Sequence, residues 1–314
     1  MPVPLYAQTI VAFIWDFDRT LIPGNQQEPL FAEYGVDPDA FWREVEKLPE
    51  YYRARGEVIS RDAAYLHHIL TYVEAGIFRG LTNAKLKDLG GRLVPSPGIP
   101  EFLDATRRHV ASEFATHGIT VEHYVASTGI REMIEGSCIA PLLDGIWANT
   151  FLESPAPPGY LERLDIDEGS HPISRIGYMI DNTTKTRAVF EINKGVNRNP
   201  SIDVNARMSE EQRRVPIRHM LYIADGPSDV PVFSLLNQRG GKTLGVYTTE
   251  PRDNFRLVKD LQEQGRIQGM AEADFRPGKA AYLWLMDSLD QIASEIVEAR
   301  QRAFSDIPNP PGHV

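Results

Sequence analysis

Short apolar runs alternate with helical patterns along most of the chain, and this alternation constrains the fold more than any other feature. Helical spacing also marks residues 101–118 and 279–302. Because an apolar run followed by a helix is typical of a strand in a parallel sheet, the pattern predicts an α/β fold with a mostly parallel sheet covered by helices on both faces. The strand-length runs are IVAFIW at 10–15, TVEHYVAS at 120–127, HMLYIADG at 219–226 and KTLGVY at 242–247.

Two segments depart from this alternation. Residues 28–93 carry only helical patterns. This predicts a helical domain at 23–94, inserted after the first strand into a core domain made of residues 1–22 and 95–314. The segment from Phe151 to Asp181 is rich in Pro and Gly and contains short extended runs, which predicts a small β-hairpin flap.

Composition and charge narrow the class of protein. The chain has 33 basic and 43 acidic residues and a formal net charge of −10, so we expect small molecules rather than nucleic acid as partners. No apolar run approaches the roughly eighteen residues of a membrane span, and the N-terminus lacks a secretion-signal pattern, so we expect no membrane partner and a cytoplasmic location. Cys138 is the only cysteine, which excludes an internal disulfide.

Four groups of chemically active side chains can meet at one edge of the predicted sheet, because open parallel sheets bind ligands beyond the carboxyl ends of their strands. Each group alone has an ordinary structural explanation, such as an N-cap, an Asx turn or a solvated lysine. Lys185 begins a short helix, where the helix dipole disfavours a cation, and this indicates an anion nearby. The groups are DFDRT at 16–20, STG at 127–129, Lys185, and Asp225 with Asp229 in ADGPSD.

The order of these groups resembles the haloacid dehalogenase (HAD) superfamily, and most closely its phosphoserine phosphatase-like branch. The resemblance rests on DxDxT, then Ser at a strand end, then Lys at a helix start, then DGxxD, and covers about residues 8–22 and 95–290. It implies a Rossmann-like core, a cap domain in the place of the helical insert, and a short flap before Lys185. The chain departs from the family pattern at Ala224, where Gly is usual. Lys194 is a rival lysine, but it ends its helix, so Lys185 is the predicted one.

The resemblance implies a phosphatase that works through an aspartyl-phosphate. Asp16 would be the nucleophile and Asp18 the general acid and base. Within the superfamily, the presence of Asp18 separates phosphatases from dehalogenases. Asp16, Asp225 and the backbone carbonyl of Asp18 offer the hard oxygen ligands that suit Mg²⁺. Asp229 would orient Lys185, or a water on the metal, without ligating the metal itself.

The STG motif at 127–129 and Lys185 would hold the transferring phosphate. Ser127, Thr128 and Gly129 would bind its oxygens through the hydroxyl and the backbone N–H groups that follow. Lys185 would neutralise the charge that develops on those oxygens.

Substrate choice has to come from the insert, because the core motifs recognise only phosphate. The family branch carries, near the position of Glu28, an acidic residue that reads a substrate amine. Three arginines in the insert could read a carboxylate or a second phosphate, or could be solvated surface residues. The candidates are Gln26, Gln27, Glu28, Arg53, Arg55 and Arg61.

The sequence therefore predicts a Mg²⁺-dependent phosphatase of a small phosphorylated metabolite. Two alternatives stay open. One is a phosphotransferase or mutase that passes the aspartyl-phosphate to an acceptor other than water. The other is a noncatalytic binding protein with the HAD fold, which is disfavoured because both Asp16 and Asp18 are present.

Overall fold

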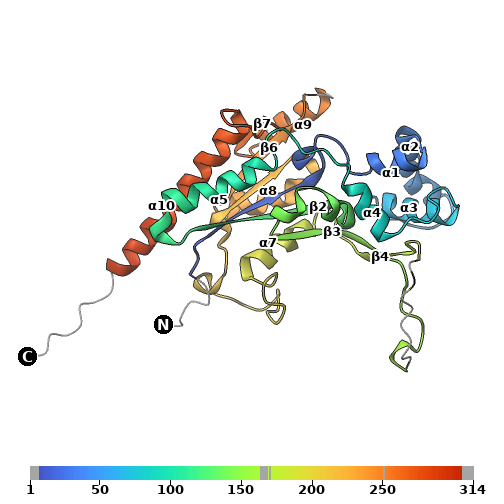
Figure 1. Ribbon diagram of the computed structural model, residues 1–314, viewed down its shortest axis with the longest axis horizontal. Helices are drawn as coiled ribbons and strands as arrows, with labels where there is room; N and C mark the ends of the chain where they lie inside the picture. Colours follow the sequence, from blue (N-terminus) through green and yellow to red (C-terminus); the bar gives the residue numbers. More distant parts are fainter. Residues whose placement is uncertain (1–6, 163–168, 170, 250–251, 306–314) are drawn as a thin grey trace, which may run out of the picture.

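A single seven-stranded sheet forms the centre of the molecule. The computed structural model describes residues 7–162, 169, 171–249 and 252–305 (Figure 1). The strand order is β4-β3-β2-β1-β5-β6-β7, and every neighbouring pair is parallel except β3 and β4. The strands are β1 (Ile10–Trp15), β2 (Thr120–Ile130), β3 (Gly145–Leu152), β4 (Arg175–Tyr178), β5 (Met220–Ala224), β6 (Lys242–Tyr247) and β7 (Gly269–Glu272).

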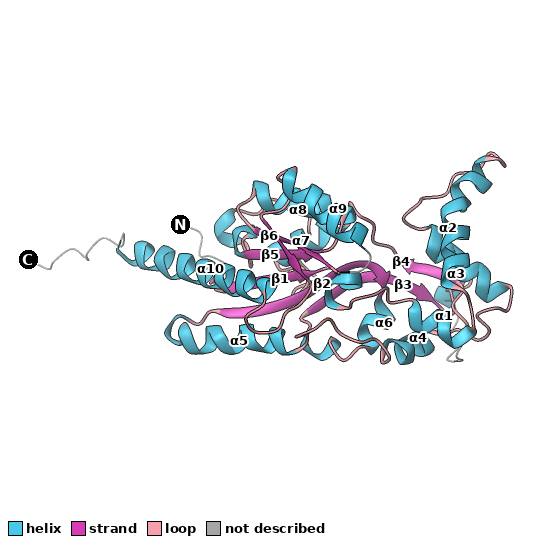
Figure 2. Ribbon diagram, turned by 90° about the horizontal axis from the view of Figure 1, so that it is seen from above, coloured by secondary structure: helices cyan, strands magenta, loops and turns pink. Residues whose placement is uncertain are grey.

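Helices cover both faces of this sheet, as Figure 2 shows. Alternate residues of β1 enter two different cores: Val11, Phe13 and Trp15 pack on one face, whereas Ala12 and Ile14 pack on the other. A central parallel strand is buried on both sides, which explains its uninterrupted apolar run. The predicted α/β architecture is confirmed. The first face is covered by α5 (Glu101–Glu113) and α10 (Ala280–Ser305), and the second by α7 (Lys185–Lys194), α8 (Val230–Gln238) and α9 (Arg252–Glu263).

The insert is helical, and its helices gather near the end of the sheet that carries β4 (Figures 1 and 2). Its apolar side chains, among them Phe41, Leu66 and Ile69, form a third core. A Cβ on Gly90 would lie 2.1 Å from the carbonyl oxygen of Met133, so glycine lets the insert approach the core domain closely at α4 and α6. The domain boundaries at 23 and 94 stay a prediction. The helices are α1 (Glu28–Tyr34), α2 (Pro38–Arg53), α3 (Ala64–Glu74), α4 (Asn83–Gly90) and, in the core domain, α6 (Arg131–Gly136).

The predicted flap begins in the last two residues of β3 and contains β4, which pairs antiparallel with β3 at the sheet edge. β3 runs parallel to β2 and pairs on its other side with β4, in antiparallel register from Thr150 to Leu152. Residues 163–168 and 170 of the predicted flap lie outside the described residues, as do residues 1–6 and 306–314 of the predicted core domain. Within the part of the chain that is described, no helix is long and apolar enough to cross a membrane.

Candidate active site

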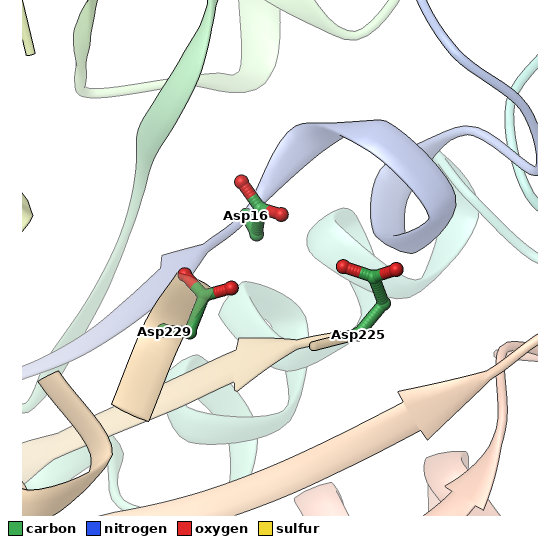
Figure 3. A group of neighbouring side chains, drawn as sticks. All are labelled: Asp16, Asp225 and Asp229. Atoms are coloured by element: carbon green, nitrogen blue, oxygen red, sulfur yellow. The ribbon is translucent and has the colours of Figure 1, made fainter. Parts of the chain in front are cut away.

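The centre of the candidate site is a group of three aspartates at the carboxyl edge of the sheet. Asp16 directly follows β1, and Asp225 directly follows the neighbouring parallel strand β5. Asp229 lies one short turn later, just before α8. One carboxylate oxygen from each residue lies within 4.8 Å of the others, and Figure 3 shows the three side chains around a common space. Adjacent parallel strands therefore bring together carboxylates that are about two hundred residues apart in sequence.

Lys185 lies against two of these aspartates. Its Nζ donates to Asp16 Oδ1 at 3.0 Å and to Asp229 Oδ1 at 2.6 Å, and its side chain is almost completely buried. Asp229 also accepts hydrogen bonds from the hydroxyls of Tyr222, at 2.5 Å, and Ser228, at 2.8 Å. Asp229, itself held by Tyr222 and Ser228, thus fixes the ammonium within bonding distance of Asp16.

The electrostatics of Lys185 follow from these contacts. Burial disfavours the charged ammonium, but the attraction of Asp16 and Asp229 and their hydrogen bonds outweigh it, so the pKa of Lys185 lies above its ordinary value. The rival Lys194 lies elsewhere: its Nζ donates to the backbone carbonyls of Val204 and Ala206. Only Lys185, of these two lysines, is placed to act on a group bound at Asp16.

The aspartates carry more negative charge than their surroundings balance. Burial raises the pKa of Asp16 well above its ordinary value, Lys185 opposes this rise, and Asp229 and Asp225 add to it. Burial, reinforced by Asp229, raises the pKa of Asp225 to about 7. Hard carboxylate oxygens that converge with excess negative charge are the donor set that Mg²⁺ prefers. These residues therefore fit a divalent cation.

Asn254 orients the carboxylate of Asp225. Its Nδ2 donates to Asp225 Oδ2 at 3.2 Å, while its Oδ1 accepts from the backbone N–H of Thr248 at 2.8 Å. Asn254 is buried on α9. Sequence reasoning missed it, because nothing in the local pattern around an asparagine on an amphipathic helix indicates a contact with a distant strand end.

Asp18 lies in an irregular turn, Phe17–Leu21, directly after Asp16. Its two carboxylate oxygens accept from the backbone N–H of Gln26 at 2.6 Å and from Gln26 Nε2 at 3.1 Å. Burial raises the pKa of Asp18 to about 6, although the bonds from Gln26 lower it. Arg19 follows with φ 55°, a left-handed conformation that is uncommon for a residue with a side chain and typical of functional turns.

The STG motif lies in a bulge of β2 and not at a helix start. The register with β3 shifts between Ala126 and Ile130, and α6 begins only at Arg131, which corrects the predicted strand-to-helix junction at Ser127. Ser127 Oγ accepts from the N–H of Gly129 at 3.0 Å. The bulge frees the backbone here from the strand ladder and lets Thr128 reach the cavity described next.

A cavity of about 290 Å³ opens above these residues. The insert contributes Trp42, Asp62 and Tyr65 to its wall, and none of the three was predicted. Tyr65 also donates its hydroxyl hydrogen bond to the carbonyl of Thr128, so the insert touches the bulge directly. The described residues around the cavity are Asp16, Asp18, Arg19, Asn25, Gln27, Trp42, Asp62, Tyr65, Thr128, Asn182, Asp225 and Ser228.

Of the six predicted specificity candidates, Gln27 lines this cavity, whereas Gln26 and the four charged residues are not among the described residues around it. Glu28 lines a different cavity and accepts from the N–H of Asn25 at 3.0 Å. Arg53 and Arg61 are exposed, and Arg55 is exposed with its guanidinium 4.8 Å above the ring of Tyr51. A role of these residues in substrate choice stays a prediction.

The sequence and the fold are each similar to those of known proteins. No family model matches the sequence. An uncharacterized protein of Borreliella burgdorferi is 38% identical over 286 residues, which cover 90% of this chain and 97% of that protein. The unliganded probable phosphoserine phosphatase of Vibrio cholerae superposes with a TM-score of 0.51 and 14% identity, over 93% of this chain and 68% of its own. A HAD family hydrolase of Salmonella enterica serovar Typhi gives a TM-score of 0.48 and 14% identity, over 82% and 67%.

Proposed function

Since this chain belongs to one family with the Borreliella burgdorferi protein and has the HAD fold in its phosphoserine phosphatase-like form, we propose that it is a Mg²⁺-dependent phosphatase of small phosphomonoesters. The observation that carries the proposal is the buried contact between Lys185 and Asp16. Asp16 lies beside Asp225 and comes two residues before Asp18 in the sequence. This arrangement offers a nucleophile and a proton donor that line one cavity, and a charge-neutralising cation in contact with the nucleophile. The cavity volume suits a small metabolite. We place the reaction in the cytoplasm, with neither nucleic acid nor membrane as a partner.

The proposed reaction has two displacements at phosphorus. Asp16 attacks the phosphorus with a carboxylate oxygen, the bond from phosphorus to the leaving oxygen breaks, and protonated Asp18 gives that oxygen its proton. Water then attacks the aspartyl-phosphate, Asp18 takes a proton from this water, and the carboxylate of Asp16 is released. Lys185 stabilises the negative charge on the transferring oxygens in both steps.

The residues around Asp16 also account for how the nucleophile can approach a dianionic phosphate. Asp16, Asp225 and the backbone carbonyl of Asp18 would hold Mg²⁺, which supplies positive charge to screen carboxylate from phosphate. Asp229 keeps Lys185 in place through its bond of 2.6 Å and is itself fixed by Tyr222 and Ser228. Thr128, which lines the same cavity, would contact the phosphate oxygens together with the bulge around it.

We predict that hydrolysis of p-nitrophenyl phosphate requires a divalent cation. The excess negative charge of the three aspartates must be screened before Asp16 can attack a phosphate. Phosphate release should therefore be rapid with Mg²⁺ and fall to background after chelation and dialysis, and it should return when Mg²⁺ is added. Full activity of the metal-free protein would refute the metal assignment.

The same assay separates the alternatives when an alcohol acceptor is added. A phosphatase releases inorganic phosphate in proportion to the p-nitrophenol formed. A phosphotransferase forms phosphorylated alcohol at the expense of inorganic phosphate. A noncatalytic binding protein forms neither product, and that result would overturn the proposed function.

We predict that substrate discrimination depends on the cavity-lining residues of the insert. Asp62→Asn and Trp42→Ala change contacts next to the leaving group, so they should alter the ratios of kcat/KM among phosphorylated metabolites by about fivefold or more, as expected for roughly one lost hydrogen bond. A panel of phosphorylated metabolites measured with Mg²⁺ checks this. Substitutions of four exposed residues serve as matched controls and should change the same kcat/KM ratios by less than about threefold. These controls are Glu28→Gln, Arg53→Ala, Arg55→Ala and Arg61→Ala.

The opposite ranking would restore the specificity role predicted for Glu28 and the three arginines. Such a result would mean that the insert moves on binding and brings those exposed side chains to the substrate.

A further inference from the structure

Gln26 makes contacts that its place in the sequence does not explain. It lies in the short connection between the first motif and α1, yet it is fully buried. Its backbone N–H and its side-chain Nε2 donate to the two different oxygens of Asp18, at 2.6 and 3.1 Å. Its Oε1 accepts from the backbone N–H of Ile130 at 2.7 Å. One residue therefore spans the distance from the carboxyl of Asp18 to the bulge of β2.

The bulge is shaped to receive this side chain. A Cβ on Gly129 would lie 1.7 Å from Gln26 Nε2, so the amide passes directly against the glycine backbone. The hydrogen bond to Gln26 comes from the N–H of Ile130, the residue at which β2 returns to register with β3 after the bulge. A glutamine that only filled space would need neither the glycine nor two directed side-chain hydrogen bonds.

We propose that Gln26 is a positioning residue that holds the carboxyl of Asp18 for proton transfer and fixes it relative to the phosphate-binding bulge. This inference rests on the proposed function, because it concerns the same reaction. Each carboxyl oxygen of Asp18 accepts one hydrogen bond from Gln26 and still has a second lone pair free. The carboxyl can thus carry a proton and direct it at the leaving oxygen while both of its oxygens remain fixed. The hydrogen bonds from Gln26 limit the orientations of the Asp18 carboxyl. A proton donor that is not aligned with the leaving oxygen accelerates the reaction less.

The leaving group provides the test. Phenolate from phenyl phosphate needs a proton as it departs, whereas dinitrophenolate from 2,4-dinitrophenyl phosphate does not. Gln26→Met has similar length and keeps the backbone N–H, but it lacks the two side-chain hydrogen bonds to Asp18 and Ile130. In this variant kcat/KM for phenyl phosphate should fall about a hundredfold, and that for 2,4-dinitrophenyl phosphate should fall less than about threefold. Gln26→Glu keeps an acceptor for Ile130 and loses the amide donor to Asp18, so it should show the same split if Gln26→Met does not fold. Asp18→Asn should show the split as well.

The controls distinguish this inference from the function on which it rests. The neighbouring Gln27→Met changes a cavity wall and not the contacts of Asp18, so it should affect both substrates alike. Adding Gln26→Met to Asp18→Asn should have little further effect, because the residue acts through Asp18. Equal losses for both substrates in the Gln26 variants would overturn the inference and leave the phosphatase standing. Absence of turnover of either ester by the wild-type protein would overturn the proposed function itself.

Discussion

The variant Asp16→Asn is expected to lose phosphate release by at least about 10⁴-fold while the protein stays folded. The amide has the shape of the carboxylate, but it lacks the negative charge and the nucleophilic oxygen that form the aspartyl-phosphate. Lys185 keeps its bond to Asp229 in this variant, so the buried ammonium is still paired. Turnover of p-nitrophenyl phosphate, together with circular dichroism and thermal unfolding, checks the prediction.

A matched control is available at another buried aspartate. Asp274 pairs with Arg276 and Lys279 and is not among the described residues around the cavity. Asp274→Asn makes the same chemical change outside the site, and its turnover should stay within about threefold of wild type, less than roughly one hydrogen bond would give. Retained turnover in Asp16→Asn would move the nucleophile to a different residue.

Replacing Lys185 by Ala should lower kcat by about 10²- to 10³-fold, the effect of removing one group that stabilises developing charge. The matched variant Lys194→Ala lies on the same helix and bonds only backbone carbonyls, so its kcat should stay within about threefold. Steady-state kinetics at saturating Mg²⁺ compare the two variants. A larger loss in Lys194→Ala would show that the other lysine serves the reaction.

Lys185→Ala should also lower the stability of the metal-free protein. The change leaves Asp16 and Asp229 buried without their cation, and breaking a buried ion pair in this way costs about 3–5 kcal/mol. Thermal unfolding without Mg²⁺ measures this loss. Kinetics should accordingly be recorded well below the unfolding temperature of the variant, so that lost folding is not mistaken for lost catalysis.

Much of the sheet could be predicted because buried parallel strands are continuous apolar runs. β1, β5 and β6 lie where their apolar runs indicate, at Ile10–Trp15, Met220–Ala224 and Lys242–Tyr247. β3 and β7 were missed. β7 has only four residues, and β3 comes directly after a short turn and before the Pro- and Gly-rich segment. Short strands near sheet edges depend on pairing with distant residues and therefore leave a weak local pattern.

In the candidate site, too, residues at strand ends could be predicted, whereas contacts between distant segments could not. The positions of Asp16 and Asp225 followed from strand ends, since parallel neighbours must end at one edge. The contacts of Gln26 with Ile130 and of Asn254 with Asp225 join segments far apart in the chain, and no spacing rule predicts them.

The insert shows why charge alone does not predict which side chains line the cavity. Arg53, Arg55 and Arg61 were chosen for their charge, but which side of a helix pair faces the core domain is decided by packing. Trp42 and Tyr65 reach the cavity because they lie on the side of the insert that meets β2. The apolar pattern of α2 and α3 predicted the helices without predicting this orientation.

The central claim is that Asp16 carries the phosphoryl group, and trapping that species tests it most directly. The Mg²⁺-loaded protein is mixed with 2,4-dinitrophenyl phosphate, quenched in acid within the first turnover, digested and examined by mass spectrometry. We predict a hydroxylamine-sensitive phosphoryl group on the peptide that contains Asp16, which appears before free phosphate and is absent from Asp16→Asn. Release of phosphate with no phosphoryl group on Asp16 at any time, or with the group on another residue, would contradict the account.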